Sequence, residues 1–336
     1  MHLAQATSDP ALAAFELPLR RTFFPLGYPL DLETNSRDVL LAAEESWGAQ
    51  ERMFNHDPVR ICLGVSDSDS ESRVPLGAIR AREHLMSIVA GPDNFLLCDF
   101  DRGFAFGWVT RSTAADRALL RYQFLAAGGI ALVQQRAFAP LHGALVMRNG
   151  SGVMFCGDSG AGKSTLAYAC ARAGWTYVTD DGTFLVRDRD DRYAIGDQHS
   201  IRFRPDSSDL FPELADHIPL FRPNGKLAIE LRPCTLGIST APGCNVDHVV
   251  FLDREDCGPA SLHRYPEDRA LEYWAQYTVL GPNDVTTAQR RCQERLLEAG
   301  LWRLRYSKLD EVVAHLERLF TTLLPNGSRN RGYRVG

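Results

Sequence analysis

No segment of this 336-residue sequence is apolar enough over a sufficient length to cross a bilayer, and charge of one sign is not concentrated anywhere in it. The longest uncharged apolar stretch near mid-chain, Tyr122 to Gln135, is shorter than the roughly 20 residues of a membrane-spanning helix and carries glutamines. Lys and Arg number 37 against 42 Asp and Glu, without a basic block or a basic-aromatic stripe. Neither a membrane nor a nucleic acid is therefore expected as a partner.

Paired cysteines and a secretory leader are also missing. The eight cysteines include no C-x-x-C pair, so we expect reduced thiols rather than a zinc or redox site. The apolar stretch from Ala11 to Leu19 is interrupted by Glu16 and Pro18, which argues against a signal peptide. Hydrophobic residues make up 45% and charged residues 24% of the chain, an ordinary globular composition. We expect a cytoplasmic protein with one large or two modest domains.

The clearest motif that is present is a complete G-x-x-x-x-G-K-[ST] phosphate loop, the Walker A sequence. Its glycines bend the chain tightly and let backbone N–H groups face an anion, while its lysine reaches the outer phosphates and its serine hydroxyl ligates Mg²⁺. ATP versus GTP stays open, because no base-reading motif is visible. The residues expected to hold the nucleotide are Gly157, Asp158, Ser159, Gly160, Ala161, Gly162, Lys163, Ser164 and Thr165.

The flanking residues provide the structural context that this motif requires. Val153 to Cys156 is a short apolar strand before the loop, and Leu166 to Ala171 predicts a helix that ends at Gly174, a typical C-cap. The first turn of such a helix adds backbone N–H groups and a dipole that favours negative charge. A chance glycine-rich turn is therefore disfavoured.

The residues before the loop predict a smaller α+β module at residues 1–135. Strand-like residues from Thr22 to Leu32 precede a helix that begins after Asn35-Ser36 and runs to about Trp47. An acidic serine run at residues 66–72 is interpreted as a solvated loop rather than a metal or phosphorylation site. Further strands, the last three in an antiparallel meander, are predicted at Arg60 to Val65, His84 to Ala90, Asn94 to Asp101 and Phe104 to Arg111.

A long helix is predicted to link this module to the next. It extends from Ala114 to Gln135 behind a cap at Ser112-Thr113, with a bend at Gly128-Gly129.

A hairpin is predicted immediately before the phosphate loop. Leu141 to Met147 and Gly152 to Cys156 are apolar runs on either side of a turn that contains Asn149-Gly150, a strong hairpin signal. This pairing places His142, at the start of the first strand, beside the phosphates. A structural histidine and a catalytic one are equally compatible with the sequence at this position.

Two adjacent carboxylates follow the next predicted strand, Trp175 to Thr179. Asp180 and Asp181 stand at its carboxyl end, in a sheet that also carries the phosphate loop, where a carboxylate can bind Mg²⁺ or accept a hydroxyl proton. Neighbouring side chains of an extended segment point to opposite faces, so the two are expected to differ in role. An Asp-Asp-Gly turn into the next strand, Thr183 to Arg187, is the competing interpretation.

Taken together, His142-Gly143, the loop from Gly157 to Ser164 and Val178-Thr179-Asp180-Asp181 resemble the catalytic core of HPr kinase/phosphorylase and its bacterial relatives, which include kinases encoded beside peptide-modification pathways. The resemblance covers about residues 138–188, with a fainter similarity onward to the strand around Val249 to Leu252. It implies a P-loop α/β kinase domain of the type that HPr kinase shares with phosphoenolpyruvate carboxykinase, at residues 136–324.

The resemblance also implies roles for single residues. Asp180 would take the proton from an acceptor serine hydroxyl, His142 would assist this carboxylate, and Lys163 would bind phosphate, so these three are the candidate catalytic residues. Ser164 would ligate magnesium, with Asp181 close to the metal. Charge neutralisation and in-line positioning are what phosphoryl transfer requires, so the chemistry of these residue types agrees.

This chain departs from that family in two places. Bifunctional members carry a glycine-rich segment with an acidic metal ligand after the aspartate pair, and Gly196 to Pro205 shows no recognisable counterpart, which leaves the reverse, phosphorolytic reaction open. The N-terminal module does not match the module usually attached to HPr kinases, so HPr itself is not indicated as the substrate. Relatives often form closed assemblies, and a homo-oligomer stays open here.

Basic residues after the aspartates are candidates for acceptor or phosphate contacts. Arg202 and Arg204 lie on a predicted strand, and Lys226 follows a turn ahead of the strand Leu227 to Leu231, where a plain surface lysine is the alternative. Asp253 ends the apolar strand Val246 to Leu252 but is not favoured as a metal ligand, because Asp180 and Asp181 already supply carboxylates.

The rest of the chain predicts core elements and a tail. Residues 325–336 form a polar, basic tail that is expected to be mobile. A further strand is predicted at Leu301 to Tyr306, and helices at Glu267 to Val279, Asp284 to Ala299 and Lys308 to Leu323.

Three functions are compatible with these residues. The first is an ATP- and Mg²⁺-dependent kinase that phosphorylates a serine hydroxyl of a peptide or small protein. The second is a kinase of a small-molecule alcohol or sugar. The third is a nucleotide-binding switch without a dedicated acceptor, against which a hydroxyl-directed carboxylate argues, since a switch needs a group that positions water. The first is the prediction adopted.

Overall fold

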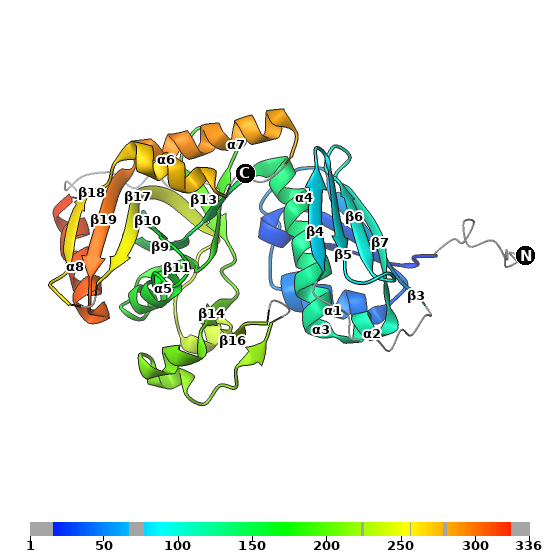
Figure 1. Ribbon diagram of the computed structural model, residues 1–336, viewed down its shortest axis with the longest axis horizontal. Coiled ribbons are helices and arrows are strands. Elements are labelled where there is room, and N and C mark those ends of the chain that lie inside the picture. Colours follow the sequence, from blue (N-terminus) through cyan, green and yellow to red (C-terminus); the bar gives the residue numbers. More distant parts are fainter. Residues whose placement is uncertain (1–15, 67–76, 223–224, 256, 278–280, 324–336) are drawn as a thin grey trace, which may run out of the picture.

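The computed structural model describes residues 16–66, 77–222, 225–255, 257–277 and 281–323, which form a mixed α/β protein with three sheets. Two large sheets, each with its own helices, lie beside one another, and a small three-stranded sheet lies below them at their junction (Figure 1). The acidic serine run beyond residue 66 and the predicted tail lie outside the described residues. Within the described parts of the chain, no helix combines the length and apolar character needed to cross a membrane.

The first sheet has seven strands in the order β1-β2-β3-β7-β6-β5-β4. The β2–β3 and β3–β7 pairs are parallel and the others antiparallel, which confirms the predicted meander of β5, β6 and β7. Its strands are β1 (Leu19–Phe23), β2 (Leu30–Thr34), β3 (Val59–Ser66), β4 (Ala78–Arg82), β5 (Leu85–Val89), β6 (Phe95–Asp99) and β7 (Phe104–Thr110).

Helix α1 (Arg37–Trp47) connects β2 to β3 and begins where the sequence predicts. The Ser36 side chain accepts a hydrogen bond from the backbone N–H of Asp38, which is the interaction expected of an N-cap. Val39 and Trp47 of this helix are buried against Leu30 and Ile61 of the sheet, so α1 contributes to the core of this module.

The linking helix differs from its prediction in its caps and its continuity. The caps are Thr110, whose hydroxyl accepts from the backbone N–H of Thr113, and Asp116, whose carboxylate accepts from that of Leu119, rather than Ser112-Thr113. Each of these caps begins a short separate helix, and the hydrophobic periodicity alone does not show where these helices begin. The linking helix consists of α2 (Arg111–Ala115), α3 (Arg117–Leu119), a π-helical segment η3 (Leu120–Ala126) and α4 (Ala127–Ala137).

The two glycines of α4 permit close packing. A Cβ at Gly128 would lie 2.5 Å from Cδ2 of Leu96, and one at Gly129 would lie 3.1 Å from the Trp47 ring. The change in helical geometry comes earlier, in η3, where the sequence contains no glycine. Gly128-Gly129 therefore lets the helix approach the sheet rather than marking a bend.

The second sheet has nine strands, with a path β11-β9-β10-β17-β13-β12-β8 to which β19 and β18 are added beyond β17. Strands β10, β17 and β19 run parallel, and the other pairs are antiparallel. Its strands are β8 (Phe138–His142), β9 (Ala144–Arg148), β10 (Ser151–Cys156), β11 (Thr176–Thr179), β12 (Gly182–Val186), β13 (Tyr193–Gly196), β17 (Gly243–Arg254), β18 (Ser261–Arg264) and β19 (Gly300–Tyr306).

The hairpin before the phosphate loop is confirmed, with one correction. Asn149 and Gly150 adopt φ values of 52° and 83° between β9 and β10, as a two-residue hairpin turn requires. The predicted strand Leu141 to Met147 is two strands separated at Gly143, because β8 pairs with β12 and only β9 pairs with β10.

Helices cover both faces of the second sheet (Figure 1). Val153 and Phe155 of β10 pack toward α5 (Lys163–Arg172) and α8 (Leu309–Leu323), while Met154 and Cys156 pack toward α6 (Glu267–Ala275) and α7 (Asn283–Arg295). A strand that is buried on both faces carries a continuous apolar run, as β10 does. The strand that feeds the phosphate loop thus lies at the centre of a three-layer core.

A small sheet and shared packing join the two modules. The small sheet has the order β14-β16-β15, formed by Ile201–Phe203, Leu227–Leu231 and Leu220–Phe221. Phe138 of β8 belongs to the core of the first module, with its ring centroid 5.3 Å from that of Phe54 and 6.4 Å from that of Tyr28. The division at residues 135 and 136 stays a prediction, and the packing is continuous across it.

Candidate active site

The phosphate loop connects the carboxyl end of β10 to the first turn of α5. Gly157, Gly160 and Gly162 have φ values of 147°, 99° and 94°, a region that side chains other than glycine rarely adopt. A Cβ at Gly162 would lie 2.6 Å from the Tyr306 hydroxyl, so glycine is also required by space. The loop therefore has the backbone shape in which N–H groups can surround an anion.

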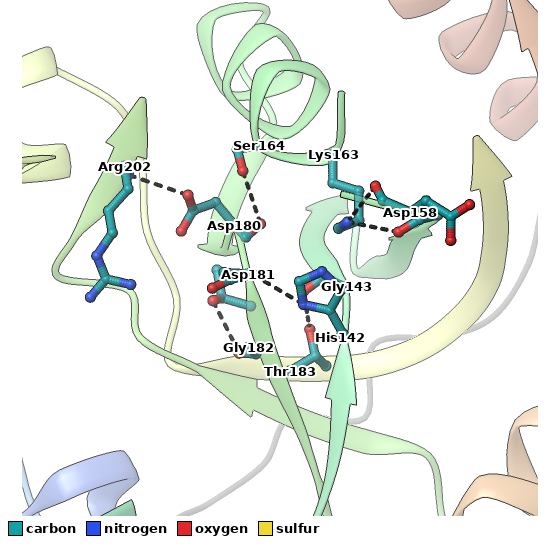
Figure 2. A network of polar contacts seen from close by, with 12 residues as sticks. His142, Gly143, Asp158, Lys163, Ser164, Asp180, Asp181, Gly182, Thr183 and Arg202 are labelled. Atoms are coloured by element: carbon teal, nitrogen blue, oxygen red, sulfur yellow. Dashed lines mark hydrogen bonds and ion pairs between the residues drawn. The ribbon is translucent and has the colours of Figure 1, made fainter. Parts of the chain in front are cut away.

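Lys163 is the first residue of α5, and its ammonium group folds back over the loop (Figure 2). Its Nζ donates to the carbonyl oxygens of Gly157 at 2.7 Å and Asp158 at 3.2 Å, and the side chain is buried. Burial lowers the pKa of Lys163, while the nearby Asp181 carboxylate opposes this effect. A cation held in this way, with part of its hydration removed, is suited to bind phosphate oxygens.

Two tyrosines that the sequence analysis did not single out brace the loop. The Tyr273 hydroxyl of α6 accepts from the backbone N–H of Gly157 at 3.0 Å and lies 3.1 Å from the carbonyl oxygen of His142. The Tyr306 hydroxyl of β19 donates to the carbonyl oxygen of Ala161 at 3.0 Å. Burial raises the pKa of both phenols, so both stay protonated. They come from distant parts of the chain, and no local pattern marks them.

Asp180 follows β11 directly and is buried, with 4% of its surface exposed. Its carboxylate accepts from the Tyr177 hydroxyl at 3.1 Å and from the backbone N–H of Arg202 at 3.2 Å. Burial raises its pKa to about 6, against the lowering effect of the Arg202 charge. Its main-chain carbonyl accepts from the Ser164 hydroxyl at 3.3 Å, which ties the backbone of Asp180 to α5, directly after the phosphate loop.

Asp181 has a different environment, as the alternation of an extended segment predicts. Its side chain is 55% exposed, and its Oδ1 lies 3.1 Å from Nδ1 of His142 (Figure 2). The hydrogen bond with His142 lowers the pKa of Asp181, so this carboxylate is ionised at neutral pH. The two neighbours therefore differ in both exposure and pKa.

Two strand pairings bring His142 to this place. It is the last residue of β8 and pairs with Gly182 of β12, so the β8–β12 ladder brings it to the aspartates. Next to it, the Gly143 N–H donates to the carbonyl oxygen of Asp181 at 2.9 Å, and the Thr183 hydroxyl donates to that of Gly143 at 2.9 Å. The predicted hairpin contributes as well, because Ala144 pairs with Phe155 of β10 and so holds the preceding His142 near the end of that strand. A catalytic role for His142 stays a prediction.

The predicted basic residues lie at different distances from the aspartates. Arg202, on β14, contacts Asp180 through its backbone, and its guanidinium lies 3.7 Å from the Glu230 carboxylate. The guanidinium of Arg204 lies 3.6 Å from where a Cβ of Gly160 would be, beside the loop. Lys226 is exposed on the turn before β16, and it is Arg222 of this turn that lines the cavity beside the aspartates.

The donor set near the loop fits a magnesium ion held by few protein ligands. The described residues contain no group of three or more His, Cys, Asp or Glu side chains arranged for a metal. The Ser164 hydroxyl and the Asp181 carboxylate are the oxygen groups that the sequence analysis assigns to magnesium. Two protein ligands are sufficient, because Mg²⁺ usually keeps several waters and phosphate oxygens besides one or two protein groups. Nε of Arg303 donates to the Asp253 carboxylate at 2.9 Å. The expectation that Asp253 is not a metal ligand stays a prediction.

Three comparisons bear on the identity of the chain. A family model described as SynChlorMet cassette protein ScmC matches residues 110–210, a segment that contains the phosphate loop and both aspartates. No curated protein matches the chain. Among solved structures, the chain is similar to the Hpr(Ser) kinase/phosphatase from Coxiella burnetii at 14% identity, over 55% of this chain and 98% of that one, with a TM-score of 0.29. A similarity of this size does not carry the function of one chain over to another.

Proposed function

We propose that this protein is an ATP- and Mg²⁺-dependent kinase that transfers the γ-phosphoryl group to a hydroxyl, that of a serine in a peptide or small protein. The observation that carries the proposal is the position of Asp180. The main chain of this buried residue bonds the Ser164 hydroxyl of the Walker A motif, and the residue also lines a cavity of about 820 Å³. A base with a pKa of about 6 between a phosphate site and an open cavity is suited to deprotonate an acceptor hydroxyl.

The phosphate loop would hold the donor. Its backbone N–H groups and the first turn of α5 favour the β- and γ-phosphates, and Lys163 and Arg204 add positive charge. A second cavity, of about 770 Å³, adjoins the first turns of α5 and the carboxyl ends of β17 and β19. Its lining includes Thr165, Arg254 and Tyr306, and its volume is sufficient for a nucleoside.

Ser164 and Asp181 would hold magnesium against the phosphates. The ion, when bound, neutralises part of the charge on the phosphoryl oxygens. His142 lies against Asp181 and holds this carboxylate in one orientation. We assign His142 to positioning and Asp180 to proton transfer.

The reaction is a direct displacement at phosphorus. The acceptor hydroxyl oxygen forms a bond to the γ-phosphorus, and the bond from this phosphorus to the bridging oxygen breaks, with its electron pair remaining on the β-phosphate of ADP. The hydroxyl proton passes to the Asp180 carboxylate. Tyr177 and the Arg202 N–H, which already donate to that carboxylate, hold it in place.

The test is transfer of labelled γ-phosphoryl from ATP to a pool of serine-containing peptides. Wild type is expected to label the pool and to lose rate as the pH falls through about 6, where Asp180 becomes protonated. Asp180→Asn should abolish transfer while ATP binding persists. Asp253→Asn is the matched control, because this carboxylate lies near the carboxyl end of β17, which pairs with β10, but is paired with arginines. Unaltered transfer by Asp180→Asn would reject the assigned base.

A further inference from the structure

The cavity beside Asp180 is built by both modules of the protein. Its volume is about 820 Å³, within the range of sites for small ligands or short peptide segments. Asp180 and Asp181 line one wall, from the P-loop domain. Trp47, Ala127 and Ile130, from α1 and α4 of the N-terminal module, form an apolar part of the lining, beside charged side chains of the same module. An acceptor that reaches Asp180 through this cavity therefore touches the N-terminal module.

A polar network spans the two walls at the edge of the cavity. Tyr122, in the π-helical segment η3, donates its hydroxyl proton to the Glu230 carboxylate of β16. Arg121 lies 3.6 Å and Arg202 3.7 Å from the same carboxylate. Burial and the Glu230 charge raise the pKa of Tyr122, which keeps this phenol protonated as a donor. Glu230 thus connects the N-terminal module to Arg202, whose backbone contacts the proposed base.

The cavity wall carries carboxylates and guanidinium groups, and they differ in how far their hydrogen bonds are satisfied. Its carboxylates have cationic or hydrogen-bonded partners: Glu45 lies 3.8 Å from Arg121, and Asp181 contacts His142. Arg222 is stacked on the Tyr122 ring, with its guanidinium carbon 4.9 Å from the ring centroid. Among the described residues, its buried Nε has no hydrogen-bond partner. Within the described chain this guanidinium donor therefore lacks a hydrogen-bond acceptor, which a carboxylate near the hydroxyl of the substrate would supply.

One face of the small sheet continues from the cavity to the surface. Arg202 pairs with Glu230, and Ala228 pairs with Leu220, so these four side chains share a face. Arg202 and Glu230 line the cavity, while Leu220, farther along the same face, is 70% exposed. An extended peptide could lie along this face with one residue inside the cavity.

We propose that this cavity is the acceptor site, that the N-terminal module supplies its second wall, and that the acceptor is a short extended peptide segment with acidic residues beside the hydroxyl. The inference rests on the proposed kinase function and specifies its acceptor half. It also gives the N-terminal module a role, which is to select the acceptor through Ala127, Ile130 and the Tyr122–Arg222 pair.

The experiment uses the full chain, ATP and synthetic peptides with one central serine, in sets with acidic, neutral or basic neighbours. Wild type should phosphorylate the acidic set about tenfold faster than the basic set. Ala127→Trp, which places an indole in the cavity, should lower kcat/KM for peptides by about tenfold or more. The affinity for a fluorescent ATP analogue should not change. Leu41→Trp is the control, because Leu41 is an exposed residue of α1 outside the cavity lining. Arg222→Gln should reduce the preference for acidic neighbours.

A second measurement does not depend on the fold of any variant. An acidic peptide with a photoreactive residue near its serine should cross-link to wild-type protein on both modules. Wild-type rates in Ala127→Trp, or cross-links confined to the P-loop domain, would overturn the acceptor site and leave the kinase proposal standing. Transfer only to free serine or small polyols would overturn the peptide assignment. Transfer to no hydroxyl at all would overturn the proposed function and this inference with it.

Discussion

Replacing Asp180 with asparagine is expected to stabilise the folded protein at neutral pH while it abolishes phosphoryl transfer. The reason is that burial raises the pKa of this carboxyl from its usual value of 3.8 to about 6. The fold therefore favours the protonated, neutral side chain over the ionised one. At neutral pH the carboxylate is ionised in spite of this, and its ionised form costs folding free energy that a neutral asparagine does not.

The size and sign of the effect follow from proton linkage. A tenfold change in a protonation equilibrium corresponds to about 1.4 kcal/mol, so a rise from 3.8 to about 6 corresponds to about 3 kcal/mol. Between these pKa values the folded state binds more protons than the unfolded state, so the contribution of Asp180 to stability falls as the pH rises and is constant above about 6. Both carboxylate oxygens of Asp180 accept hydrogen bonds, one from Tyr177 and one from the Arg202 N–H. The NH₂ group of an asparagine cannot accept, so one of these hydrogen bonds is lost, and its loss offsets about 1 kcal/mol of the gain.

The assay is urea denaturation of wild type and Asp180→Asn between about pH 4 and about pH 7. The difference in free energy of unfolding should move in favour of the variant by about 3 kcal/mol across this interval and then stay level. Asp181→Asn is the control with the opposite sign, because His142 lowers the pKa of Asp181 and its ionised form stabilises the fold. If the difference in free energy of unfolding between wild type and Asp180→Asn did not change with pH, Asp180 would not be a buried base with a raised pKa.

Three further predictions concern the loop, the metal and the linking helix. Lys163→Met should weaken ATP binding by about tenfold or more with little change in the fold, measured with a fluorescent ATP analogue, because its ammonium group lies over the loop. Asp181→Asn should raise the Mg²⁺ concentration needed for half-maximal transfer, and an unchanged requirement would exclude it as a ligand. Gly128→Ala should lower the free energy of unfolding by about 1–3 kcal/mol, since the added Cβ would lie 2.5 Å from the Leu96 side chain.

Turns, helix caps and the phosphate loop were predictable because the residues that specify each of them lie close together in the sequence. Asn149-Gly150 specifies a tight turn, Ser36 caps α1, and Gly174 follows α5 with a φ of 87°. The loop from Gly157 to Ser164 is recognised by glycines whose positive φ values the structure bears out. The opposite surroundings of Asp180 and Asp181 also follow from sequence, because alternation along an extended chain is a geometric property of the backbone.

Contacts between distant segments were not predictable in this way. Tyr273 and Tyr306 brace the loop from more than a hundred residues away, and their hydrogen bonds depend on how β19 and α6 pack. The break at Gly143 was missed because an apolar run does not show where a strand changes its pairing partner. The caps at Thr110 and Asp116 were missed because a helical period does not show where one helix ends and the next begins.

The sequence by itself determined the backbone shape of the loop from Gly157 to Ser164, since that shape depends on glycines in a fixed order over a short span. Only the tertiary structure decided the surroundings of Asp180. The cavity wall formed by Trp47, Ala127 and Tyr122 meets Asp180 and Arg222 because two separately built sheets pack together. Burial, which raises the pKa of Asp180 to about 6, is likewise a property of that packing and not of any residue taken alone.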